Sequence, residues 1–187
     1  MKSYSVLVLA ILSSSGAWSQ NLEIQFLDVG QGDGTLIVCP NGKRILVDLG
    51  SNGGKSATQK AAIGQHVRNN LRMQAGQRVL DFLVVTHPDG DHFNLLKAAL
   101  TGVTISAAIY GGDFQNFNSG FRNFFSAFET SGQLPTGHHD PENQPTNRLD
   151  CGSAEIWILA ANVVEPTNQN NLVNNTPSVV LRIDFQG

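Results

Sequence analysis

The chain is organised around residues 81–92, which read Asp-Phe-Leu-Val-Val-Thr-His-Pro-Asp-Gly-Asp-His. The first part, Phe82–Val85, is apolar and β-branched, which is typical of a strand buried on both faces. Pro88 keeps the residue before it extended, and Gly90 permits a sharp turn. The second part therefore brings together, at the end of a core strand, four potential metal ligands: His87, Asp89, Asp91 and His92.

Two interpretations of this cluster are open. A polar loop between a strand and a helix, with Asp91 as the helix N-cap, would account for a lone Asp or His. Two His and two Asp around a Pro and a Gly fit a metal site better, because imidazole nitrogens and carboxylate oxygens are metal ligands. The spacing therefore favours a metal site, and it says less about the reaction.

Three motifs together resemble a known family. His-x-Asp-x-Asp-His at 87–92 looks like a variant of the His-x-His-x-Asp-His signature of metallo-β-lactamase-fold hydrolases. Asp-Val-Gly-Gln-Gly-Asp-Gly at 28–34 and Leu-Val-Asp-Leu-Gly at 46–50 are similar to motifs of one subgroup. That subgroup is the hydrolase domain of ComEC-type DNA-uptake competence proteins and their secreted stand-alone relatives. The resemblance covers residues 22–187, with 111–152 poorly matched, and implies an α/β fold of the four-layer αββα type.

The resemblance also implies a dinuclear centre with two divalent ions, Zn²⁺ or Mn²⁺. His87 and Asp89 would bind one ion, and Asp91 and His92 the second. Asp91 would also orient the attacking water as the catalytic carboxylate, and Asp48 would support the cluster by hydrogen bonds. Asp89 stands where the family usually has His, and an oxygen ligand shifts the preference towards Mn²⁺.

The glycine-rich loop at 28–34 is the candidate wall of the active site. Its glycines let backbone N–H groups converge on an anion or line a cleft, and a plain turn is the alternative. With the resemblance, Asp28, Gln31 and Asp33 become candidates for contact with substrate. Asn175 lies where many relatives carry a His ligand, so it implies a poor ligand or a substrate contact, and an Asn-rich turn is the alternative.

Residues 1–19 predict a secretory signal peptide. Lys2 precedes the apolar run 6–12, and Ala17-x-Ser19 fits a small-x-small cleavage site. An uncleaved anchor is the alternative, although the apolar run is short for one. We therefore expect a secreted or periplasmic bacterial protein that does not contact the membrane after the signal is removed.

The rest of the chain predicts one domain, residues 20–187. In the family, a hairpin and a metal-bridging Asp follow the last strand, so we expect an incomplete sandwich with its N-terminal half and the start of the second. Cys39 and Cys151 are the only cysteines. They could pair in an exported chain or remain two buried thiols.

Charge argues against a nucleic-acid substrate. The formal net charge is −3, and removal of Lys2 makes it one unit more negative. A nucleic-acid binder normally has a basic stripe. The expected partner is a small molecule or a phosphodiester, and nucleic acid stays an open alternative.

Periodicity and turn residues predict the secondary structure. Ser56 and Gln59 form a capping-box pattern, and the region 131–152, with His138-His139-Asp140, is expected to be a long loop. A core face is expected for the Phe-rich helix at 121–128. The expected strands are 22–26, 35–39, 44–48, 79–86, 104–110, 155–160 and 178–185, and the other helices are 57–74 and 93–101.

The function expected from these features is a secreted metal-dependent hydrolase that uses a dinuclear metal-activated water, of a phosphodiesterase or nuclease-like kind. A non-catalytic exported domain that keeps the cluster for metal binding or as a relic is the first alternative. A family hydrolase of esters, lactones or β-lactams is the second.

Overall fold

The computed structural model describes residues 21–126, 131–133, 137–138, 148–161 and 178–186. The expected signal peptide lies outside these residues, as do His139, Asp140 and Asn175. Within the described part, no helix is both long and apolar enough to cross a membrane.

The larger of two sheets has seven strands in the order β1-β2-β3-β5-β6-β7, with β4 paired to β5. β1, β2 and β3 are antiparallel, whereas β3, β5, β6 and β7 run parallel. The carboxyl ends of β3 and β5 therefore lie at one edge, where open α/β sheets bind ligands. The strands are β1 (Glu23–Phe26), β2 (Gly34–Val38), β3 (Arg44–Leu49), β4 (Arg72–Gln74), β5 (Gln77–Val85), β6 (Val103–Tyr110) and β7 (Ser131–Gln133).

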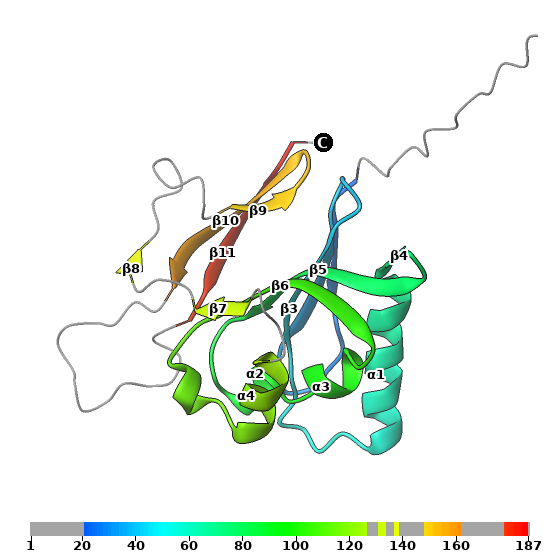
Figure 1. Cartoon of the computed structure of the whole chain (residues 1–187), viewed down its shortest axis with the longest axis vertical. Coiled ribbons are helices and arrows are strands. Elements are labelled where there is room, and N and C mark those ends of the chain that lie inside the picture. The colour runs from blue at the N-terminus through cyan, green and yellow to red at the C-terminus, as the bar shows by residue number, and fades with distance from the viewer. Residues whose placement is uncertain (1–20, 127–130, 134–136, 139–147, 162–177, 187) are drawn as a thin grey trace, which may run out of the picture.

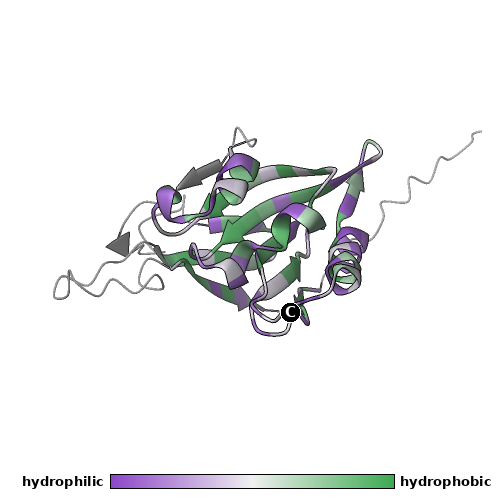
Figure 2. Cartoon of the chain, turned by 90° about the horizontal axis from the view of Figure 1, so that it is seen from below, coloured by the Kyte–Doolittle hydropathy of each residue, from purple (hydrophilic) through white to green (hydrophobic). Residues whose placement is uncertain are grey.

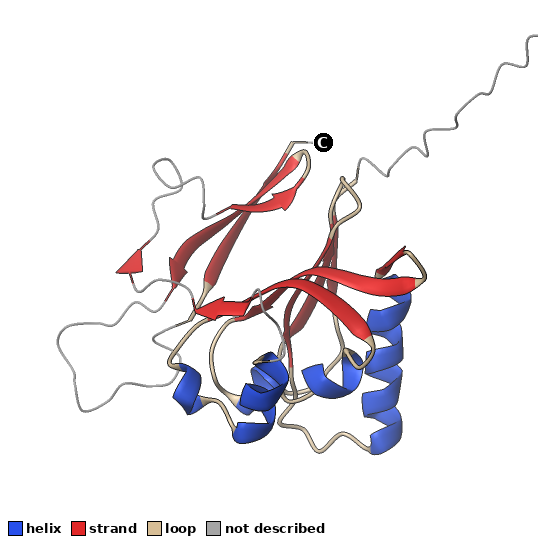
Figure 3. Cartoon of the chain, in the orientation of Figure 1, coloured by secondary structure: helices blue, strands red, loops and turns tan. Residues whose placement is uncertain are grey.

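Helices cover one face of this sheet, and a second sheet lies against the other (Figures 1 and 3). The second sheet has the order β11-β10-β8, with β9 paired to β10. Its strands are β8 (Gly137–His138), β9 (Arg148–Cys151), β10 (Ala154–Ala161) and β11 (Val180–Phe185). The helices are α1 (Ala57–Asn70), α2 (Gly90–Phe93), α3 (Leu96–Ala99), the 3-10 helix η1 (Phe114–Asn116) and α4 (Ser119–Phe125).

These layers confirm the α/β class. A helix layer followed by two sheets matches the first three layers of the expected αββα sandwich, and the described residues supply no helix layer beyond the second sheet. Many residues of the coloured strands are hydrophobic, whereas α1 carries many hydrophilic residues (Figure 2).

β5 is buried on both faces, as its apolar run predicts. Leu83 and Val85 belong to the core between the large sheet and the helices. Val84 belongs to the second core, between the two sheets, with Ile156 and Ile158 of β10. Because side chains alternate along a strand, one central strand serves both cores.

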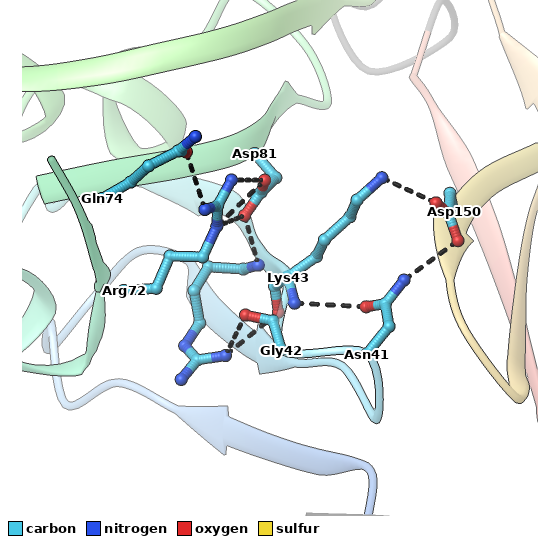
Figure 4. A network of polar contacts seen from close by, with 8 residues as sticks. Asn41, Gly42, Lys43, Arg72, Gln74, Asp81 and Asp150 are labelled. Atoms are coloured by element: carbon cyan, nitrogen blue, oxygen red, sulfur yellow. Dashed lines mark hydrogen bonds and ion pairs between the residues drawn. The ribbon is translucent and has the colours of Figure 1, made fainter. Parts of the chain in front are cut away.

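The predicted helix 57–74 is wrong at its C-terminal end. The capping box at Ser56 and Gln59 is present, but α1 ends at Asn70 and residues 72–74 form β4. Ala75 and Gly76 turn the chain with φ of 50° and 82°, which suits a two-residue hairpin. Arg72 then pairs with the buried carboxylate of Asp81 at 2.5 Å (Figure 4). This ion pair gives β4 a polar anchor that helical periodicity does not reveal.

Other predicted elements hold with corrections. Strand β1 forms, but its apolar side chains Ile24 and Phe26 are 40% and 84% exposed. The core face of α4 is confirmed for Phe121 and Phe125, whereas Phe128 lies outside the described residues. The predicted loop 131–152 contains three short strands, β7, β8 and β9.

A disulfide answers the open question about the two cysteines. Cys39 follows β2, Cys151 ends β9, and the two are bonded. Beside them, the Lys43 ammonium lies 2.6 Å from Asp150, and the Asn41 side chain donates to the same carboxylate at 3.0 Å (Figure 4). The β2–β3 turn is therefore joined to the second sheet by one covalent bond and a polar clasp.

Candidate metal centre

A bulge at the end of β3 directs Asp48 into the site. Pairing with β2 skips from Val47 to Leu49, so Asp48 is the extra residue. Its φ is 54°, in the left-handed region that Asp tolerates better than most residues. The side chain is 3% exposed, and a buried carboxylate needs partners.

Thr86, directly after β5, supplies two of those partners. Its backbone N–H donates to Asp48 Oδ1 at 2.7 Å, and its hydroxyl donates to Oδ2 at 2.6 Å. The same Oγ1 lies 3.1 Å from His87 Nδ1 and 3.2 Å from His92 Nδ1. One threonine thus touches the carboxylate and both imidazoles.

Counting protons assigns the tautomers of both histidines. The Thr86 hydroxyl has one proton and gives it to Asp48, so Oγ1 accepts from His87 Nδ1–H. His92 Nδ1 lies 2.8 Å from Asp48 Oδ2, which accepts its proton. In the neutral state, each ring therefore keeps an unprotonated Nε2, the atom that can bind a metal.

Both Nε2 atoms face carboxylates. His87 Nε2 lies 3.7 Å from Asp89 Oδ2, and His92 Nε2 lies 3.3 Å from Asp33 Oδ2. The two ring centroids are 3.7 Å apart. The site thus contains two imidazole–carboxylate pairs, His87 with Asp89 and His92 with Asp33, and the two imidazole rings are neighbours.

The environment shifts the two histidines in opposite directions. Burial, and then the neighbouring His92, lower the pKa of His87. Burial also opposes protonation of His92, but the hydrogen bond to Asp48 and the nearby carboxylates outweigh it and raise the pKa of His92. Asp33 and Asp91 are among those carboxylates.

The predicted helix 93–101 forms only in part, as α3, and the separate helix α2 precedes it. The backbone oxygen of Asp91 accepts from Asp33 N–H at 3.0 Å, and Leu95 N–H donates to Leu49 O at 3.0 Å. These bonds replace the helical bond between Leu95 and Asp91. The chain therefore forms two short helices, α2 and α3, and the turn between them is held by β3 and the 28–34 loop.

The candidate cleft residues separate into two groups. Asp33 meets His92, as described above. Asp28 is 98% exposed at its side chain, and its carboxylate lies 4.0 Å from the Lys55 ammonium. Gln31 is exposed, and its backbone oxygen accepts from Asn52 N–H at 2.6 Å. Asn175 lies outside the described residues.

The chemical types of the donor atoms at this site are ones that divalent ions bind. Two imidazole nitrogens with carboxylate oxygens are ligands that Zn²⁺ and Mn²⁺ accept. Within the described ranges, however, no three His, Cys, Asp or Glu side chains gather closely enough to hold one ion. Among the described residues, each imidazole Nε2 thus has one carboxylate oxygen facing it.

Sequence reasoning missed Thr86 and the close contact at Gly50. A Cβ at Gly50 would lie 2.2 Å from the Asp91 carbonyl carbon, so only glycine fits there. The Leu-Gly that follows Asp48 was a signal for this contact. Thr86 is a small polar residue between a buried strand and His87, a position that could have drawn attention.

Comparisons with known proteins are distant. No protein-family model matches the chain, and no curated protein matches it. Among solved structures, it is similar to CmlA, a diiron β-hydroxylase from Streptomyces venezuelae, with 16% identity and a TM-score of 0.46 over 88% of this chain. A mutant of the same enzyme gives 16% identity and a TM-score of 0.43 over 86%. The chain spans 28% of the length of each, and this likeness assigns no activity.

Proposed function

We propose that this chain is a metal-dependent hydrolase whose centre is built on His87, Asp89 and His92, at the end of β5. The observation that carries the proposal is the arrangement of the two imidazoles. Each Nδ1 is engaged by Thr86 or Asp48, and each Nε2 faces a carboxylate oxygen. A carboxylate oxygen beside each Nε2 places two kinds of metal-binding atom next to each other.

A divalent ion bound there would supply Lewis acidity towards a substrate oxygen and towards water. The protein's contribution is to hold the ligands. Asp48 and Thr86 orient the rings, and the bulge and the buried strand end keep those two residues rigid. Asp48 is buried and Thr86 is half-buried, so bulk water has limited access to their hydrogen bonds.

We propose that Asp91 orients the attacking water and accepts its proton. Asp91 lies in the first turn of α2, and its charge acts on both His87 and His92. A carboxylate beside two metal-binding nitrogens is well placed to act as a general base. This role rests on position and on the resemblance of the 87–92 motif.

The proposed substrate class is a phosphodiester, and the proposed location is outside the cytoplasm. The similarity of residues 28–34 and 46–50 to ComEC-type hydrolase domains supports the substrate class. The Cys39–Cys151 disulfide supports an oxidising compartment, because such bonds persist mainly in exported proteins. The signal-like pattern of residues 1–19 points the same way.

A non-catalytic metal-binding domain is the second candidate. It is favoured by one observation: within the part of the chain that the structure describes, no three ligands gather for a single ion. Such a domain would bind an ion through the same histidines and hydrolyse nothing.

Hydrolysis of bis-para-nitrophenyl phosphate with Mn²⁺ or Zn²⁺ separates these candidates. We expect turnover by the wild type and a loss of at least about 100-fold in Asp91→Asn, which removes a general base. Metal binding should persist in Asp91→Asn. A wild type that binds metal without turning over this substrate, or other esters, would support the non-catalytic candidate and contradict the hydrolase.

A further inference from the structure

The backbone of Asp33 is held by the site itself. Its N–H donates to the carbonyl of Asp91 at 3.0 Å, and its carbonyl accepts from Gly50 N–H at 2.9 Å. Asp91 lies in α2, and Gly50 follows β3. The 28–34 loop is therefore hydrogen-bonded to α2, which contains His92, and to the end of β3, the strand that contains Asp48.

Two glycines make this approach possible. A Cβ at Gly32 would lie 2.3 Å from the Gly50 oxygen, and a Cβ at Gly50 would lie 2.3 Å from the Asp91 oxygen. Such distances exclude any larger side chain without a shift of backbone. Three segments distant in sequence thus meet backbone to backbone. These contacts restrict the position of the Asp33 backbone, from which its carboxylate extends.

The Asp33 carboxylate lies at a ligand-to-ligand distance from His92. Its Oδ2 is 3.3 Å from His92 Nε2, and its side chain is 65% exposed. Two donor atoms that share one ion, each with a bond of roughly 2.0–2.2 Å, lie roughly 3.0–3.6 Å apart. The separation therefore suits two ligands of one ion, and the exposure leaves room for an ion and its water.

We propose that Asp33 is a direct ligand of the divalent ion bound by His92, which deepens the proposed function and rests on it. The family resemblance of the 87–92 motif pairs His92 with its neighbour Asp91 for this ion. The geometry adds a carboxylate from a loop nearly sixty residues earlier. The 28–34 motif then supplies a metal ligand, and Gly32 and Gly50 are needed to deliver it.

The test is ion binding by the whole chain, with Asp33→Asn compared with Asp28→Asn. Asp28 lies in the same loop and is the matched control, because its carboxylate faces Lys55. Titration calorimetry with Mn²⁺ measures affinity and stoichiometry without any turnover. We expect Asp33→Asn to weaken one ion at least about tenfold, since even the loss of an outer partner of a ligand costs that much. Asp28→Asn should bind as the wild type does.

A second variant guards against a folding defect. Asp33→Glu keeps a carboxylate and should recover part of the lost affinity, while urea unfolding reports the stability of all variants. Folded Asp33→Asn with unchanged binding of every ion would overturn this inference and leave the proposed function intact. A folded wild type that binds no Mn²⁺ or Zn²⁺ would instead overturn the proposed function.

Discussion

Thr86 holds the ring of His87 directly, and it acts on His92 through Asp48, whose carboxylate accepts from both Thr86 and His92. Its single hydroxyl proton goes to Asp48, and its oxygen accepts from His87, so it cannot serve a different tautomer without losing a bond. Metal-binding histidines in proteins commonly have such a partner on the other ring nitrogen. Here one side chain is shared between two rings.

Thr86→Val tests this residue, because valine has a similar shape and no hydroxyl. The buried Asp48 carboxylate loses a donor, so we expect a loss of about 1–3 kcal/mol in the free energy of unfolding. We also expect a loss of about 10–100-fold in metal affinity. Urea unfolding and calorimetry measure the two effects. Thr86→Ser, which keeps the hydroxyl, should stay close to wild type, and an equal loss in Ser and Val would contradict the hydrogen-bond role.

At this scale the sequence predicts ligands better than it predicts partners. Spacing alone predicts His87, Asp89 and His92 as candidate ligands, because residues on a short loop are close in any conformation. The meeting of Asp33 with His92 depends on a tertiary contact at Gly50, which no local pattern contains. The bulge at Asp48 could not be predicted from the sequence for the same reason, since it depends on how β3 pairs with β2.

Among the elements, β3, α2 and the 28–34 loop meet backbone to backbone at Gly50. Gly50→Ala places a methyl group 2.2 Å from backbone atoms of Asp91. We expect a loss of about 1–3 kcal/mol in unfolding free energy, the usual cost of overpacking, together with weaker metal binding.

The matched control for Gly50→Ala is Gly120→Ala in α4. The nearest atom to its Cβ would be Asn118 Oδ1 at 3.4 Å, an ordinary contact. Alanine should leave stability unchanged or raise it by up to about 1 kcal/mol, because it favours helices. Urea unfolding compares the two variants, and equal effects would contradict the packing argument.

The disulfide links two elements that lie 112 residues apart in sequence. Replacing both Cys39 and Cys151 with Ala should lower the free energy of unfolding by roughly 2–5 kcal/mol, because the unfolded chain gains freedom. Denaturation with and without reductant measures this. The wild type should respond to reductant and the double variant should not; a wild type indifferent to reductant would contradict a structural role for the bond.

Element boundaries show why local patterns fail at particular places. Helical spacing extends through Leu71, yet the chain leaves the helix because Arg72 pairs with Asp81 and Ala75–Gly76 form a turn. α2 and α3 do not join into one helix because Leu95 N–H bonds Leu49 rather than Asp91. In both cases a tertiary hydrogen bond or ion pair outweighs local propensity.

On the scale of the whole molecule, a disulfide, an apolar core and a polar clasp join the two sheets. The hydrogen bond from Lys43, and then the Gly152 backbone N–H, lower the pKa of the Asp150 carboxyl. A lowered folded-state pKa contributes stability above the unfolded value, and that contribution disappears as pH falls through the folded value. The clasp should therefore stabilise the protein near neutral pH and fail in acid.

Asp150→Asn measures the clasp. Since the carboxylate is mostly exposed, we expect a loss below about 1 kcal/mol at neutral pH. The gap between wild type and variant should close as pH falls below 3.8, the ordinary pKa of the group. Urea unfolding across this range follows the gap, and a gap that widens in acid would contradict the assigned direction.

The fold class, the sheet order near β5 and the position of the histidines all lead to one claim: the strand-end cluster binds divalent ions. The most direct test is metal analysis and calorimetry of the whole chain with Mn²⁺ and Zn²⁺, beside a His87→Ala/His92→Ala double variant checked for folding. We predict bound ion in the wild type and none in the double variant. A folded wild type that binds neither metal, or a double variant that binds as well as wild type, would contradict the claim.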